Sequence, residues 1–328
     1  MGRDFRGFVM QKIVVLIGGK SPERKVSLVS GSEISKQLKS NGYQVIEMDP
    51  ADYEKGHELI QAIDVHKPDL VFIGLHGGEG ENGILQAMLA GSKIPFTGSD
   101  YKASAVAMDK LLSKIIALQV GVPVPNYKLY NKSDYQTGTR QSMDDCSKLL
   151  SISETANELV VKPVDAGSSV GVHIVNDESS WQKALADAFQ YSERVLVEEY
   201  IEGRELTVTI LDKEALPVVE IKPHNGFYDY PNKYTSGNTD YIAPAELDQQ
   251  EVDLVQDYAV RIWQAMECSG YGRIDFRYDG KTFYFLEVNT LPGMTPLSLT
   301  PMAAKAVGIS FGELLDRIIG TVNKNLIL

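Results

Sequence analysis

The sequence predicts an α/β fold in its N-terminal third and an α+β fold in the remainder. A near-continuous apolar run at residues 12–17 ends in Gly18-Gly19, which is typical of a buried parallel strand. Strand and helix patterns then alternate up to about residue 100, as they do in a doubly wound domain. Much later, residues 283–288 are rich in aromatic and β-branched types and predict a strand of a mixed domain.

The other elements follow in a regular order. In the N-terminal domain we expect strands at 12–17, 43–48 and 70–75, and helices at 27–39 and 59–65. A helix at 103–119 ends before Gly121, and the prolines 123 and 125 that follow are a common helix stop. Farther along, the predicted elements are strands at 160–163, 173–175 and 194–200 and a helix at 181–189. Residues 131–159 are polar and Ser-rich and predict no particular element.

Composition limits the class of function. The 328 residues carry a net charge of −12, which argues against a nucleic-acid scaffold and against binding to an anionic membrane surface. Two cysteines are too few for a disulfide framework and favour the reducing cytoplasm. No apolar run approaches the roughly 20 residues of a membrane span.

A group of oxygen-bearing side chains predicts a metal site. Glu287 and Asn289 lie on one face of the strand that begins at residue 283, and Asp275 lies on the preceding strand pattern beside Arg273. Two carboxylates and an amide suit a hard cation such as Mg²⁺. The alternative is a solvated strand face. Asp275 and Glu287 are an even number of positions apart, so we expect an odd-numbered loop around 279–280 to bring them opposite each other.

Two further segments are candidate nucleotide contacts. Residues 165–171 form a small-residue loop, whose backbone N–H groups suit phosphates, and Lys162 and Lys110 are candidate phosphate cations. A plain hairpin loop and surface lysines are the alternatives. Gly19-Lys20-Ser21 resembles the end of a P-loop, but position 14 is a valine where that motif needs glycine, so we reject it.

The strand at 194–200 runs into Glu202-Gly203-Arg204-Glu205. A strand that leaves into a linker offers backbone groups to an adenine edge, and a carboxylate there suits ribose hydroxyls. From the spacing alone, an ordinary edge strand with solvated acids is the preferred interpretation.

Eight motifs in order make the chain resemble one family, the D-alanine–D-alanine ligases of the ATP-grasp superfamily. The resemblance spans nearly the whole chain. The motifs contain Glu23 with Val26-Ser27-Leu28, His76 with Gly83, Lys110, Lys162, Ser168 with Gly171, Lys233-Tyr234, Arg273 with Asp275, and Glu287 with Asn289 and Gly293.

The resemblance implies an ATP-grasp fold of three domains, with ATP held between the last two. The domains are an N-terminal α/β substrate domain at 1–102, a central subdomain at 103–197 and a C-terminal subdomain at 198–328. The implied ATP contacts are Lys110, Lys162, Ser168, Ser169, Glu198, Glu199, Ile201, Glu205 and Lys233. The implied ligands of Mg²⁺ or Mn²⁺, two ions in all, are Asp275, Glu287 and Asn289.

The implied reaction joins two D-alanines through a D-alanyl phosphate, which supplies peptidoglycan synthesis and the cell wall. Catalytic roles fall to Glu23, Ser168, Tyr234, Arg273, Gly293 and Ser298, and substrate contacts to Glu23, His76, Lys233, Arg273 and Ser298. Residues 222–240 resemble a closing loop over this site. The family also implies a homodimer with no nucleic-acid or membrane partner.

The chain departs from the family at two positions beside the substrate. Leu297 stands where many members have histidine, and Gly77-Gly78-Glu79 lacks a common arginine. Two rival functions stay open. One is a ligase that joins D-alanine to D-serine or D-lactate, for which Tyr234 is the discriminating position. The other is a catalytically silent ATP-binding regulatory module, against which the intact lysines, metal ligands and Arg273 argue.

Overall fold

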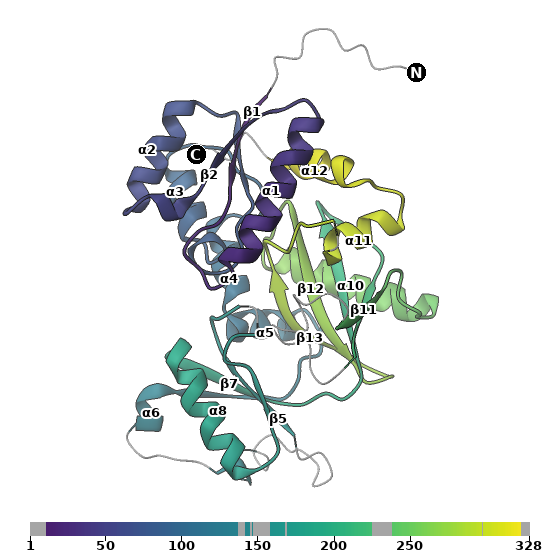
Figure 1. The fold of residues 1–328 in the computed structure, drawn as a ribbon. Coiled ribbons are helices and arrows are strands. Elements are labelled where there is room, and N and C mark those ends of the chain that lie inside the picture. The colour runs from purple at the N-terminus through teal and green to yellow at the C-terminus, as the bar shows by residue number, and fades with distance from the viewer. Residues whose placement is uncertain are drawn as a thin grey trace.

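A computed structural model describes residues 11–136, 142–144, 146, 158–167, 169–224, 238–296 and 298–322. Three sheets follow one another along the chain, and Figure 1 shows them from top to bottom as an N-terminal unit, a C-terminal sheet and a central sheet. The predicted domain ranges stay a prediction, and the boundary between residues 197 and 198 falls inside a strand of the central sheet, at Arg194–Glu199.

The N-terminal unit has the predicted parallel sheet, in the order β2-β1-β3. β1 (Lys12–Leu16) and β3 (Leu70–Ile73) are almost fully buried, while β2 (Gln44–Met48) is the half-buried edge. The helices of this unit are α1 (Arg24–Ser40), α2 (Gly56–His66) and α3 (Ile84–Gly91), with short 3₁₀ turns at Pro50–Asp52 and Gly78–Gly80. The predicted doubly wound pattern is confirmed.

The predicted helix at 103–119 is two helices, α4 (Tyr101–Met108) and α5 (Lys110–Gln119). Asp109 separates them because its backbone is extended, at ψ 101°, and its carboxylate caps α5 by accepting from the N–H groups of Leu111 and Leu112 at 3.0 and 2.9 Å. This cap makes Lys110 the first residue of α5.

The central sheet is antiparallel in the order β4-β7-β5-β6. Its strands are β4 (Tyr127–Asn131), β5 (Leu159–Pro163), β6 (His173–Val175) and β7 (Arg194–Glu199), accompanied by α6 (Lys132–Gln136) and α8 (Glu178–Tyr191). α8 packs on β5 and β7 with Trp181 fully buried, so this sheet has its own core.

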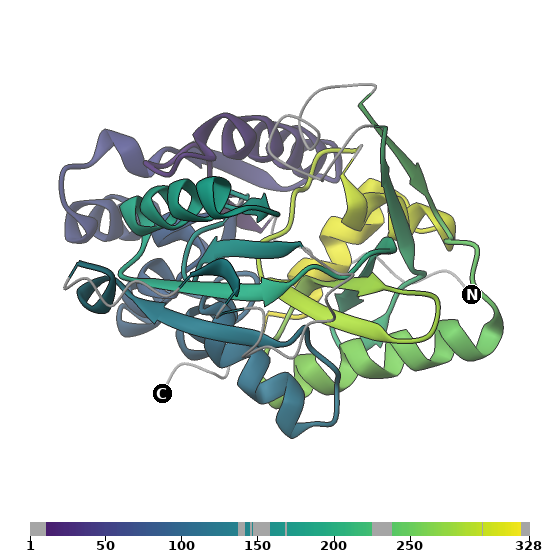
Figure 2. The same cartoon turned by 90° about the horizontal axis from the view of Figure 1, so that it is seen from below.

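The C-terminal sheet has the order β11-β10-β8-β12-β13, and β9 pairs with β8. Its strands are β8 (Arg204–Leu211), β9 (Glu214–Ala215), β10 (Val219–Pro223), β11 (Thr239–Ile242), β12 (Tyr271–Tyr278) and β13 (Phe283–Asn289). Seen from below, α10 (Gln249–Ala265) runs along this sheet (Figure 2), and it shares a core with α5. α11 (Leu299–Ala306) and α12 (Phe311–Gly320) share a core with the N-terminal unit.

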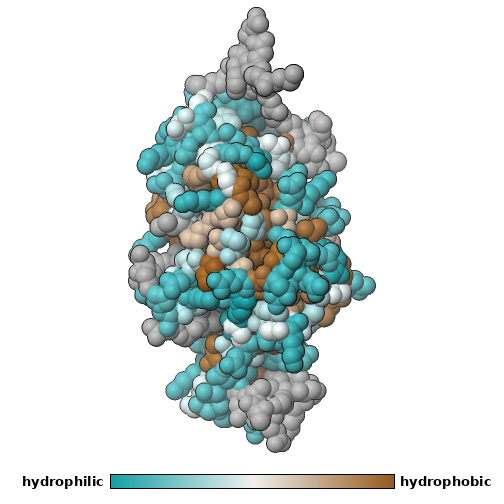
Figure 3. Space-filling view, turned by 90° about the vertical axis from the view of Figure 1, so that its right-hand side faces the viewer, coloured by the Kyte–Doolittle hydropathy of each residue, from teal (hydrophilic) through white to brown (hydrophobic). Residues whose placement is uncertain are grey.

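The face on the right of Figure 1 is mostly hydrophilic, with hydrophobic residues gathered near its middle (Figure 3). Among the described residues, no helix is long and apolar enough to cross a membrane.

The predicted odd-numbered loop between β12 and β13 is wrong. Tyr278 pairs with Phe283, so the loop at 279–282 has an even number of residues. The register instead shifts inside the sheet, between Asp275 and Phe276, where Leu286 is an extra residue of β13. This β-bulge brings Asp275 opposite Glu287, which is the arrangement that the metal prediction requires.

Candidate functional site

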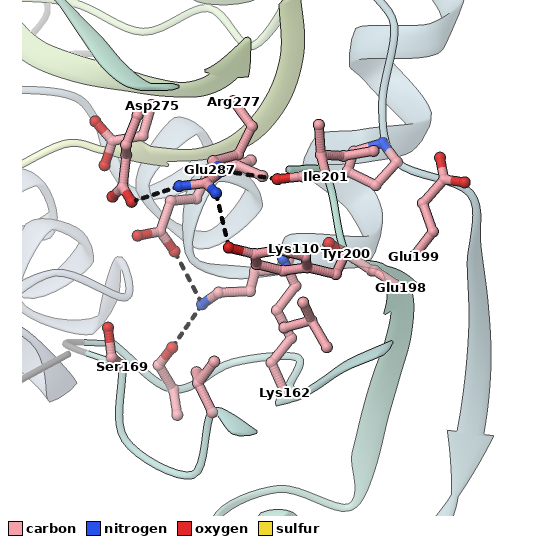
Figure 4. Close-up of a pocket in the computed structure, with 16 residues that line it drawn as sticks. Lys110, Lys162, Ser169, Glu198, Glu199, Tyr200, Ile201, Asp275, Arg277 and Glu287 are labelled. Carbon is pink, nitrogen blue, oxygen red and sulfur yellow. Dashed lines mark hydrogen bonds and ion pairs between the residues drawn. The ribbon is translucent and has the colours of Figure 1, made fainter. Parts of the chain in front are cut away.

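A pocket lies between the central and C-terminal sheets, at the place where the chain passes from one to the other (Figure 4). Its walls come from six elements, α5, β5, β7, β8, β12 and β13, and from loop residues that include the linker at 200–201. Of the residues predicted to bind ATP or metal, those that line it are Lys110, Lys162, Ser169, Glu198, Glu199, Ile201, Glu205, Asp275 and Glu287.

The two predicted phosphate lysines enter the pocket from different elements. Lys162, on β5, pairs with Glu198 of β7 at 2.8 Å. Lys110 lies between two walls, because its Nζ donates to the carbonyl of Ala166 at 2.6 Å and pairs with Glu287 at 3.3 Å (Figure 4). Both lysines are about 6% exposed, so a surface role is excluded. Their side chains supply positive charge at the base of the pocket.

Glu198 is only 2% exposed, yet its surroundings favour the ionised form. Burial alone would raise its pKa, but Lys114 and Lys162 together hold that pKa below its usual range. The neighbouring Glu199 points elsewhere, since its carboxylate accepts from the backbone N–H of Asn126 at 2.9 Å.

Asp275 is the centre of the predicted metal ligands. Its carboxylate accepts from Thr207 at 2.6 Å, from Asn289 Nδ2 at 2.9 Å and from two nitrogens of Arg273 at 2.8 and 3.0 Å. Glu287 lies directly opposite on β13. The predicted group is therefore assembled, with Arg273 held in a bidentate pair inside it.

The donor set fits a hard divalent cation. Two carboxylates from adjacent strands face the pocket, and such ions usually take one or two carboxylates together with phosphate oxygens. Among the described residues, no three His, Cys, Asp or Glu side chains form a cluster; the third predicted ligand, Asn289, is an amide.

The loop at 165–171 borders the same pocket. Ser169 lines it and has a left-handed backbone, at φ 57°. Lys110 of α5 is hydrogen-bonded to this loop and paired with Glu287 of β13. One ammonium group therefore connects α5, the loop and a strand that carries predicted metal ligands.

The N-terminal unit brings Glu23 to the same loop. Glu23 Oε2 lies where a Cβ atom of residue 77 would stand, and 3.3 Å from the Cβ position of Gly167. Any residue other than glycine at 77 would therefore displace the carboxylate. On the C-terminal side, Ser298 lies against Gly293, with its Oγ 3.0 Å from the corresponding Cβ position, and it bonds to Thr295.

His76 lies between the N-terminal unit and the turn after β13. Its Nδ1 donates to the carbonyl of Leu291 at 2.8 Å, and its Nε2 accepts from Ser30 at 2.9 Å. Burial lowers the pKa of His76 to about 4, and the charge of Arg273 contributes to the same shift. His76 is thus a neutral link between two domains, with both ring nitrogens already bonded.

Comparison with known proteins identifies the family. The family model for the D-ala D-ala ligase C-terminus matches residues 116–320. A D-alanine–D-alanine ligase from Syntrophotalea carbinolica is 41% identical over 309 residues, which are 94% of this chain and 95% of that protein. The chain belongs to the D-alanine–D-alanine ligase family.

Solved structures of ligases agree with this assignment. The D-alanine–D-alanine ligase of Bacillus anthracis complexed with ATP has a TM-score of 0.80 at 32% identity and covers 95% of this chain and 97% of its own. The VanG D-Ala:D-Ser ligase of Enterococcus faecalis has a TM-score of 0.78 at 30% identity, with 95% and 99% covered. The predicted ATP-grasp fold is confirmed.

Four positions of interest lie outside the described residues. Ser168, Lys233 and Tyr234 were predicted for the ligase site, and Leu297 is one of the two departures from the family pattern.

Sequence reasoning missed two residues, one that lines this pocket and one directly behind it. Arg277 lines it and donates to the carbonyl of Ile201 and to the Tyr200 hydroxyl, both at 3.0 Å, while its guanidinium pairs with Glu205 at 3.4 Å. Lys114 pairs with Glu198 from behind at 3.0 Å. Periodicity was the available signal, because Arg277 is two positions from Asp275 on a strand and Lys114 is four from Lys110 on a helix.

Proposed function

We propose that this chain uses ATP to join two molecules of D-alanine into D-alanyl-D-alanine. The observation that carries the proposal is the pocket, in which the lysines and carboxylates that the family resemblance predicts converge from two sheets in a chain of this ligase family. A solved relative that is complexed with ATP and covers nearly the whole chain supports ATP as the nucleotide substrate.

ATP lies between the central and C-terminal sheets in this proposal. Lys110, Lys162 and the loop at 165–171 neutralise and hold its phosphates. The linker backbone at Ile201 meets the adenine edge, and Glu205 accepts from the ribose hydroxyls. Arg277 holds both of these groups in place. Lys233, outside the described residues, stays a predicted contact.

Asp275, Glu287 and Asn289 would hold Mg²⁺ or Mn²⁺, with two ions expected, and these ions would supply positive charge to the phosphates. The bidentate pair between Arg273 and Asp275 keeps the guanidinium next to the carboxylates, where it stabilises developing negative charge.

The reaction has two steps. A carboxylate oxygen of the first D-alanine attacks the γ-phosphorus; the new O–P bond forms as the bond to the bridging oxygen breaks, and ADP leaves. The amine of the second D-alanine then attacks the acyl carbon of D-alanyl phosphate. A C–N bond forms, inorganic phosphate leaves and the nitrogen gives up a proton.

The substrates occupy the end of the pocket next to the N-terminal unit. Glu23 suits the ammonium of the first D-alanine, and Ser298 suits the carboxylate of the second. Arg273 and the backbone N–H of Gly293 suit the oxyanion of the tetrahedral species. Tyr234 and Ser168 stay predicted partners of Glu23, and His76 supports the site by joining its two sides. A homodimer and a cytoplasmic location stay predictions of the same resemblance.

The test is product formation with competing nucleophiles. The purified chain is incubated with ATP, Mg²⁺ and D-alanine, L-alanine, D-serine or D-lactate, and ADP and the condensed products are quantified. We expect ADP and D-alanyl-D-alanine in equal amounts, with D-alanine required. A preference for D-serine as second substrate would favour the activity of the VanG relative instead. ATP binding without any product would indicate the silent regulatory module.

A further inference from the structure

Lys114 is buried behind the nucleotide pocket and has no role in the proposal so far. It follows Lys110 by one turn of α5, and its side chain is 0% exposed. Its Nζ lies 3.0 Å from Glu198 Oε1 and donates to the backbone carbonyl of Phe285 at 3.2 Å. Fully buried lysines are rare, and burial lowers the pKa of this one to about 8 although Glu198 opposes that shift.

The lysine joins the two sheets that form the pocket. Glu198 belongs to β7 of the central sheet, whereas Phe285 belongs to β13 of the C-terminal sheet. The ammonium of Lys114 therefore bonds to both walls at the floor of the pocket, and the Phe285 ring lies 5.9 Å from it.

Glu198 is shared between two lysines. Lys162 pairs with Oε2 at 2.8 Å from the pocket side, and Lys114 pairs with Oε1 from the buried side. One carboxylate cannot neutralise two ammonium groups, so a positive charge remains in excess within this triad. Of the two lysines, only Lys162 is among the residues that line the pocket, so it is the one that can turn toward an anion.

Without Lys114, Lys162 would no longer be free to turn from Glu198 toward an anion. Among the described residues, Lys162 would then be the remaining ion-pair partner of Glu198, and its movement toward a phosphate would leave a carboxylate that is 2% exposed without a counter-charge. A buried unpaired charge is strongly unfavourable. Lys162 would then stay on Glu198 and bind phosphate poorly.

We propose that Lys114 is a positioning residue for ATP, which keeps Glu198 paired so that Lys162 is available to the phosphates. This inference rests on the proposed function, because it assumes that Lys162 contacts ATP.

The test compares a nucleotide that has phosphates with one that has none. Binding of a non-hydrolysable ATP analogue with Mg²⁺, and of adenosine, is measured by calorimetry for the unaltered chain and for Lys114→Met. We expect affinity for the analogue to fall about tenfold in the variant, while affinity for adenosine is unchanged. Lys114→Gln, which keeps a donor for Phe285 without the charge, is expected to behave like Lys114→Met and serves if the latter does not fold.

Two controls separate this role from a loss of packing. Lys132→Met breaks another lysine–glutamate pair, with Glu193 at 2.8 Å, away from the pocket, and should leave both affinities unchanged. In a Glu198→Gln background the carboxylate is absent, so adding Lys114→Met should cost no further affinity for the analogue.

Three results would overturn the assignment: unchanged affinity for the analogue in a folded Lys114 variant, an equal loss for adenosine, or full additivity in the double variant. Failure of the unaltered chain to bind the analogue would instead overturn the proposed function, and this assignment with it.

Discussion

Glu287 faces Asp275 across two strands, and its carboxylate also pairs with Lys110. It therefore connects the metal ligands with the phosphate lysines. Glu287 could be predicted from the sequence, because the alternation of the strand and the carboxylate side chain can both be read from it. The ion pair of Glu287 with Lys110 could not be predicted from the sequence, because it depends on how α5 packs against β13.

Glu287→Gln is expected to reduce turnover by about 10²–10³ and to leave the fold intact. The amide keeps the shape of the side chain but removes a negative charge from the metal site. Turnover is measured at saturating Mg²⁺, beside the exposed Glu246→Gln as control. A rate within tenfold of the unaltered chain would contradict the ligand role.

His76 makes the stability of the folded chain depend on pH. The folded chain keeps the ring neutral down to about pH 4, whereas the unfolded chain protonates it near 6.5. The contribution of His76 to the free energy of unfolding is complete above pH 6.5 and is lost as the pH falls toward 4. The loss is on the order of 3 kcal/mol, at 1.36 kcal/mol per pKa unit. Compared with the unaltered chain, His76→Gln should lose less unfolding free energy in denaturant titrations between pH 7 and 4. The exposed His57→Gln should match the unaltered chain, and parallel profiles for all three would refute the role of His76.

At the scale of elements, strands and helices were predicted well where the apolar period was clear. The α4–α5 break was missed because good helix formers stand on both sides of Asp109, although aspartate itself is a weak helix former and a common N-cap. The β-bulge at Leu286 was missed because register depends on the paired strand as well as on the loop. Both deviations place functional side chains: the first orients Lys110, and the second brings Glu287 opposite Asp275.

The loop at 279–282 supplies a test at this scale. Gly280 has φ 93° and nothing within 4 Å of its Cβ position, so alanine there adds backbone strain without a clash. Gly280→Ala should lower the free energy of unfolding by about 1 kcal/mol in chemical denaturation and leave ATP affinity unchanged. Gly91→Ala, in open space within α3, should not destabilise. If Gly280→Ala and Gly91→Ala were equally stable, the turn would accept alanine without backbone strain, which would contradict this prediction.

At the scale of the whole molecule, the site is assembled from segments more than 200 residues apart. His76 bonds to Leu291, and Glu81 accepts from the N–H groups of Gly77 and Leu291 at 3.0 and 3.3 Å. The sequence predicted which motifs belong together through their resemblance to a family. Periodicity alone could not predict these contacts between domains, because it describes one element at a time.

The central claim is that ATP activates D-alanine as an acyl phosphate, and oxygen transfer tests it most directly. D-alanine labelled with ¹⁸O in its carboxylate is supplied with ATP and Mg²⁺, and the inorganic phosphate is analysed by mass spectrometry. We predict one ¹⁸O atom in the phosphate for each dipeptide formed, because the carboxylate oxygen that attacks phosphorus leaves with it. Unlabelled phosphate, released together with dipeptide, would contradict the account.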